Sequence, residues 1–80
     1  MEKSSLTPRQ MSLLRFDDKI GHPDLDDMCF ALLRMRPLDL IDKTTGPSKN
    51  LDMESLMIRM QYLEAALSED VLISIENLVE

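Results

Sequence analysis

The chain has no tryptophan, one cysteine, two glycines and three aromatic residues among its 80 positions, and it contains no long apolar run. Because Cys29 has no second thiol with which to form an internal disulfide, we exclude a small secreted scaffold and expect a reducing compartment. The first residues lack the apolar core of a signal peptide, and no segment approaches the ~18 apolar residues of a membrane span. These absences predict a soluble, cytoplasmic protein.

Positive charge is also scarce, since nine Lys and Arg residues stand against fifteen Asp and Glu residues and give a net charge of −6. Such a chain repels phosphate backbones and anionic lipid headgroups, so we expect neither nucleic acid nor a membrane as a partner. Apolar residues make up 44% of the sequence, which is too many for a disordered tail. A chain this short buries only about 60% of its unfolded surface, and we therefore expect one marginal domain that depends on a protein partner.

Residues that could carry chemistry are few. His22 is the only histidine and lies between Gly21 and Pro23, where we expect a loop position rather than a ligand. With Cys29 as the only thiol, no zinc set can be assembled, and the acidic run over 17–27 lacks the spacing of an EF-hand. There is no glycine-rich phosphate loop and no context for a Ser-His-Asp triad. We expect no enzymatic activity, no metal, no cofactor and no small-molecule substrate.

The first half of the chain predicts two short helices. Thr7 and Gln10 form a capping box that begins the first helix, which should end near Asp17, just before the sequence KIGHP. The second helix begins at Asp24, and its apolar residues at helical spacing are Leu25, Met28, Cys29 and Leu32, with Phe30 and Leu33 widening the apolar side. Pro37 interrupts this pattern, so 38–42 is either a kinked continuation or a separate turn, and 43–50 is a polar loop.

The last thirty residues predict two helices, over 53–66 and 69–79, with Asp52 and Ser68 as their N-caps and a tight corner between them. No segment shows sustained alternation of apolar and polar residues, so no strand is expected. The fold class is all-α: a small cluster of three to four short helices with a C-terminal helical hairpin. Residues 1–23 form a capped helix and turn whose packing the pattern leaves open, and 24–80 form the helical domain.

The run that begins at Leu51, LDMESL, followed by Ile58, Glu64 and then LSEDVLISI over 67–75, resembles the core of the MOZART family of mitotic-spindle organising proteins. In that family a leucine-aspartate step begins the middle helix and a short corner leads into the final helix. The lengths agree without a gap from Leu51 to the end. The chain departs from the family at the corner, where Ala66, Ser68 and Glu69 replace a glycine and an Asn-Pro pair, and residues 1–50 are only loosely alike.

This resemblance implies a non-enzymatic subunit that binds helical N-terminal extensions of γ-tubulin complex proteins. Such a subunit supports assembly or recruitment of the microtubule-nucleating complex at microtubule-organising centres such as the centrosome, which places it at the cytoskeleton. Burial of apolar side chains would hold both the subunit and its partner. The residues expected to pack the two C-terminal helices are Leu56, Met60, Leu63, Leu72 and Ile75. The residues expected to contact the partner are Met57, Ile58, Tyr62 and Val79.

Two other interpretations stay open. One is a small acidic helical inhibitor or chaperone, of a phage or secretion-system type, that masks a partner surface. The other is a helical bundle that associates with itself. Salt separates the first from an apolar docking subunit, because binding through charge weakens steeply as screening increases and apolar burial does not.

Overall fold

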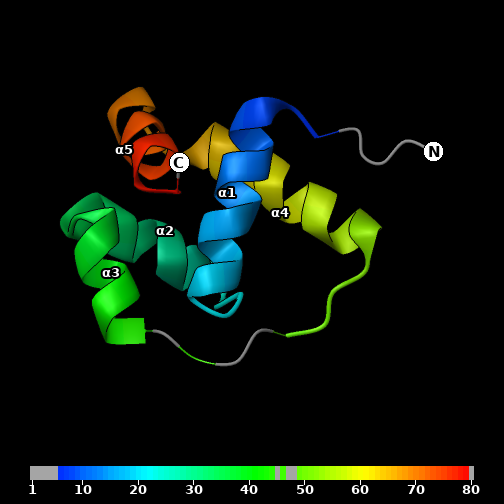
Figure 1. Cartoon of the computed structure of the whole chain (residues 1–80), viewed down its shortest axis with the longest axis horizontal. Coiled ribbons are helices and arrows are strands. Elements are labelled where there is room, and N and C mark those ends of the chain that lie inside the picture. Colours follow the sequence, from blue (N-terminus) through cyan, green and yellow to red (C-terminus); the bar gives the residue numbers. More distant parts are fainter. Residues whose placement is uncertain (1–5, 45, 47–48, 80) are drawn as a thin grey trace.

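The computed structural model describes residues 6–44, 46 and 49–79, which form five α-helices (Figure 1). The prediction of an all-α fold is confirmed, and no strand occurs in these ranges. The described ranges hold one helix more than the three to four expected, and residues 1–5 of the expected N-terminal unit lie outside them. The helices are α1 (Pro8–Lys19), α2 (Leu25–Arg34), α3 (Pro37–Thr44), α4 (Met53–Ala66) and α5 (Glu69–Val79).

The helix starts follow local capping signals. The Thr7 hydroxyl accepts a hydrogen bond from the Gln10 N–H at 3.1 Å, and the Gln10 side-chain oxygen accepts one from the Thr7 N–H at 3.0 Å. This is the predicted capping box, which satisfies two N–H groups that the first turn leaves without helical partners. Asp24 and Asp52 cap α2 and α4 more simply, with a side-chain oxygen that accepts backbone N–H groups of the first turn, and the predicted bounds of α4 and α5 are confirmed.

Pro37 explains the additional helix. A proline has no N–H to donate, but the first residue of a helix needs none, and the fixed φ angle of proline suits that position. Pro37 therefore begins α3 instead of kinking α2, which has already ended at Arg34. Because α3 extends to Thr44, the polar loop is shorter than the predicted 43–50, and its residues 45, 47 and 48 lie outside the described ranges.

Helix α1 lies at the centre of the molecule. In Figure 1 it stands in the middle, α4 crosses it, and α2, α3 and α5 lie on the left. Among the described residues α1 packs mainly on α5 and α4, whereas α4 and α5 make few contacts with one another. The two C-terminal helices are thus held together through α1. The side chains of the shared core are Leu13, Phe16, Ile20, Met28, Cys29, Leu32, Leu40, Met60, Leu63, Leu67, Leu72 and Ile75.

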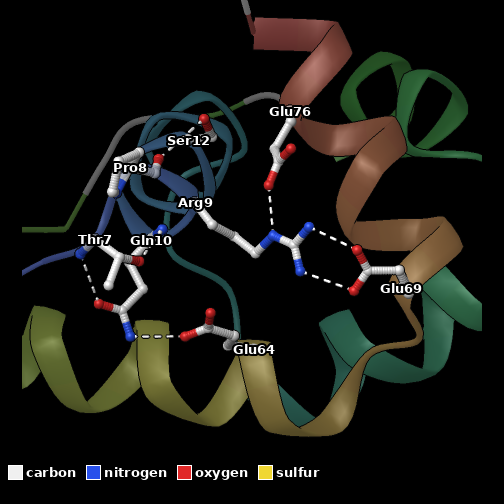
Figure 2. A network of polar contacts seen from close by, with 8 residues as sticks. All are labelled: Thr7, Pro8, Arg9, Gln10, Ser12, Glu64, Glu69 and Glu76. Atoms are coloured by element: carbon white, nitrogen blue, oxygen red, sulfur yellow. Dashed lines mark hydrogen bonds and ion pairs between the residues drawn. The ribbon is translucent and has the colours of Figure 1, made fainter.

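A polar network fixes the start of α1 to both C-terminal helices (Figure 2). The guanidinium of Arg9 donates two hydrogen bonds to Glu69, at 2.9 and 2.8 Å, and its Nε donates to Glu76. The Gln10 amide donates to Glu64 of α4 at 2.8 Å. The hydrogen bonds that Arg9 donates to Glu69 and, second, to Glu76 raise the pKa of Arg9, and the same bond to Arg9 lowers the pKa of Glu69. Arg9 therefore stays charged and holds α1 against α5.

Phe16→Ala is expected to lower the free energy of unfolding by about 3–5 kcal/mol, because the ring is fully buried in α1 and its loss leaves a cavity. Phe30→Ala is the matched control, and it is expected to change stability by no more than about 0.5 kcal/mol because the Phe30 ring is largely exposed. Urea unfolding followed by far-ultraviolet circular dichroism measures both. Equal losses would contradict the core described above.

Acid is expected to weaken the attachment of α1 to α5. Because the pKa of Glu69 in the folded chain lies below its ordinary value of 4.5, this carboxylate contributes stability above that value and loses it as the pH falls through the lower folded pKa. Glu69→Gln should therefore lower Tm at about pH 7 and differ little from the parent chain at about pH 3. Thermal melts across this range test it, and a Tm difference that does not change with pH would argue against the ion pair.

Candidate functional site

The turn after α1 places a histidine in the interior. Gly21 has a φ angle of 86°, its N–H donates to the Asp18 carbonyl at 3.2 Å, and the His22 N–H donates to the Asp17 carbonyl at 3.0 Å. These two bonds are the Schellman motif that ends many helices. His22 also adopts a positive φ of 55°, which non-glycine residues seldom do. The sequence KIGHP is therefore a helix-ending turn that buries an imidazole, and α1 continues past the predicted end near Asp17.

Asp17, His22 and Arg59 form a buried polar group, here called the Asp17 cluster. The Asp17 side chain is 0% exposed and that of Arg59 is 13% exposed. Arg59 donates to both Asp17 oxygens at 2.7 Å and to the Pro23 carbonyl at 2.7 Å, and His22 Nδ1 lies 2.7 Å from Asp17 Oδ2. In the described ranges no buried side-chain nitrogen or oxygen lacks a partner. The cluster joins the end of α1, the turn before α2 and the middle of α4.

One turn beyond Arg59, a hydrogen bond joins α4 to α2. The Tyr62 hydroxyl donates to an oxygen of Asp26 at 2.5 Å, and this bond raises the pKa of Tyr62. Burial raises the pKa of the nearby Cys29 thiol, and the charge of Asp26 adds to that effect. Both groups are therefore harder to deprotonate here than in a free cysteine or tyrosine.

An open cleft of about 460 Å³ lies beside these residues. The Asp17 cluster adjoins this cleft, because Arg59 and the buried His22 contribute to its lining. Its remaining charged groups are two carboxylates and one ammonium group. The full lining is His22, Pro23, Asp24, Leu25, Asp26, Lys49, Leu51, Arg59 and Tyr62. The cleft thus combines polar groups that already form hydrogen bonds, such as Arg59 and Asp26, with the apolar side chains of Leu25 and Leu51.

Several large apolar side chains of α2 and α4 are exposed, and one of them, Tyr62, also lines the cleft. Phe30 and Leu33 of α2 are 61% and 60% exposed, and Ile58 and Tyr62 of α4 are 58% and 42% exposed. Asp26, Phe30 and Leu33 follow one another at steps of four and three and so share one side of α2, while Ile58 and Tyr62 are one turn apart on α4. The Tyr62–Asp26 hydrogen bond places these two sides next to each other. We call Phe30, Leu33, Ile58 and Tyr62 the α2–α4 face.

The residues expected to contact a partner are divided by the structure. Ile58 and Tyr62 are exposed on the α2–α4 face, whereas Met57 is half-buried and Val79 is half-buried against the core. Of the residues expected to pack the C-terminal helices, four are buried in the shared core to which α1 also contributes: Met60, Leu63, Leu72 and Ile75. The fifth, Leu56, is half-buried and is not part of that core.

Two features were missed by reasoning from the sequence. Phe30 and Leu33 were expected only to widen the apolar side of their helix, although an apolar side broader than one neighbour can cover is itself a signal of a docking surface. The pairing of Asp17 with Arg59 had no local signal, because the two residues are 42 positions apart.

A second, smaller groove of about 190 Å³ lies between α3 and α5, and its lining is Arg36, Pro37, Leu38, Ser74 and Leu78. In the part of the chain that the structure describes, no three His, Cys, Asp or Glu side chains are placed to hold a metal ion. The helices found over the same residues are all too short or too polar to cross a bilayer.

Comparison of the chain with protein-family models, curated proteins and solved structures finds no match.

Asp17→Asn is expected to lower the free energy of unfolding by about 3 kcal/mol or more, because an amide presents N–H donors to the donors of Arg59 and His22 and leaves a buried cation unpaired. Asp42→Asn, an equal change at an exposed position of α3, is the control and should alter stability by at most about 0.5 kcal/mol. Urea unfolding compares the two variants. If they unfold alike, the Asp17 cluster does not hold α1 to α4.

Proposed function

We propose that the chain is a non-enzymatic docking subunit that binds a helix of a protein partner on the α2–α4 face. The observation that carries this proposal is the exposure of four large apolar side chains on one face, although a closed core lies behind them. Exposed apolar patches of this kind on small proteins commonly mark interaction sites. Full burial of each such side chain contributes roughly 1.5–3 kcal/mol, so the face can support specific binding.

The shape of the face favours a helix as the ligand. Helices α2 and α4 contact each other, and the Tyr62–Asp26 bond joins their exposed sides. A groove formed by two helices accepts the apolar stripe of a third, with side chains at steps of three and four residues entering it. Four titratable groups at the cleft, His22, Asp26, Arg59 and Tyr62, are held in hydrogen bonds, which supports binding rather than chemistry as the role of this region.

The resemblance of residues 51–80 to the MOZART family supports a specific partner, a helical N-terminal extension of a γ-tubulin complex protein. In this role the chain helps to assemble or recruit the microtubule-nucleating complex at a microtubule-organising centre. The all-α fold and the tight corner between α4 and α5 fit this proposal. The acidic inhibitor is less well supported, because several carboxylates are already paired within the chain: Asp17 with Arg59, Asp39 with Arg36, and Glu69 and Glu76 with Arg9.

Ile58→Ser is expected to weaken binding to a peptide from such an N-terminal extension by about tenfold or more, because it removes apolar area from the α2–α4 face. Ile73→Ser is the matched control, since Ile73 is also exposed but lies on α5, away from this face. Isothermal titration calorimetry with the full chain measures both.

Binding by the parent chain should also persist in high salt, as expected for apolar burial. If Ile58→Ser and Ile73→Ser weaken binding equally, the α2–α4 face is not the docking site. If the parent chain does not bind the peptide, the proposed γ-tubulin complex partner is wrong.

A further inference from the structure

Charge is distributed unevenly along the α2–α4 face. Asp24, Asp26 and Asp27 lie at the first turn of α2, whereas Arg34 is the last residue of that helix and its guanidinium lies 5.1 Å from the centre of the Phe30 ring. Over the ten residues of α2, about 15 Å, the face therefore changes from an acidic end to a basic end. The acidic end adjoins the cleft.

The cations near the acidic end do not neutralise it. Arg59 donates through Nε and Nη2 to Asp17 and through Nη2 to the Pro23 carbonyl, so that its charge is balanced by a buried carboxylate. Among the charged groups that line the cleft, Lys49 then stands alone against Asp24 and Asp26. The result is a surplus of negative charge beside exposed apolar side chains.

The two carboxylates keep the capacity to bind a further donor. Asp24 accepts the backbone N–H groups of Asp26 and Asp27 at 2.9 and 3.3 Å, and Asp26 accepts the Tyr62 hydroxyl through one oxygen. An ionised carboxylate has about four acceptor positions, so each can also accept hydrogen bonds from an ammonium or guanidinium group. Both side chains are exposed to a partner.

Resting on the proposed function, we infer that the partner's helix is basic and amphipathic, with Lys or Arg beside its apolar stripe at the end that meets Asp24 and Asp26. Its apolar side chains cover Phe30, Leu33, Ile58 and Tyr62, and its cation enters the acidic cleft. The Arg34 end of the face excludes a second cluster of cations, so the charges also set the direction in which the helix lies.

A second copy of this chain is a poorer occupant. Each copy carries a net charge of −6 and offers Arg34, already stacked on Phe30, to the three aspartates of its neighbour. A basic helix brings complementary charge without that repulsion.

The probes for this inference are two synthetic amphipathic peptides that share the same apolar stripe of leucine and alanine. Beside that stripe, one peptide carries lysines and the other carries glutamates. The test variant is Asp24→Ser with Asp26→Asn, because serine is a good N-cap and an asparagine oxygen can still accept the Tyr62 hydroxyl. The control is Asp39→Asn with Asp42→Asn, which removes the same charge from α3. Fluorescence anisotropy with the full chain measures affinity at about 50 mM salt.

The parent chain is expected to bind the lysine peptide at least about tenfold more tightly than the glutamate peptide. The Asp24 and Asp26 variant should lose most of that preference, and the α3 control should keep it. Equal binding of both peptides by the parent chain, weakened by Ile58→Ser, would overturn the inference and leave the docking proposal standing.

Three other results would overturn the inference. The first is equal loss of preference in the test variant and the α3 control, which would show that only net charge matters. The second is the absence of binding to the lysine peptide. The third is sedimentation showing a dimer that Ile58→Ser dissociates, which would make the second copy the occupant. Loss of binding in the Asp24 and Asp26 variant together with no effect of Ile58→Ser would reject the docking proposal itself, and the inference with it.

Discussion

The bidentate ion pair between Asp17 and Arg59 sets the relative position of two helices that are far apart in the sequence. Removing both charges from water is costly, and the geometry offsets this through three hydrogen bonds to Asp17 and one more from Arg59 to a backbone carbonyl. Tyr62 follows Arg59 by one turn, and Asp26 follows Pro23 by three residues. The ion pair therefore also determines that Tyr62 meets Asp26, and with it the position of the α2–α4 face.

Local signals in the sequence predicted the local structure well. The capping box at Thr7 and the N-caps at Asp24 and Asp52 begin helices where they were expected, because a cap depends only on residues within one turn. The placement of α1 between α4 and α5 could not be predicted, since it depends on which apolar surfaces fit together in three dimensions. The pairing of Asp17 with Arg59 was also beyond prediction, because either residue alone is an ordinary surface charge.

Where local signals competed, the prediction of the bounds was less accurate. Helix α1 ends at Lys19, two residues after the predicted end near Asp17, because the left-handed conformation of Gly21 closes the last turn by hydrogen bonds to preceding carbonyls. Pro37 was expected to disrupt a helix and instead begins one, since proline is destabilising in a helix interior but suited to its first position. The exposure of Phe30 and Leu33 depends on how wide a strip of α2 its neighbours cover, which the spacing of apolar residues does not specify.

The contact between α1 and α5 has a consequence for how the protein is made. These two helices are the first and last of those the structure describes, yet they pack against each other more extensively than any other pair among them. Contacts between segments distant in sequence form slowly, because closing the long loop between them costs conformational entropy. While the ribosome is still extending the polypeptide, Leu13 and Phe16 lack the cover that Leu72 and Ile75 provide. The nascent chain must therefore complete its core after synthesis of α5, and before that moment its apolar side chains are open to chaperones.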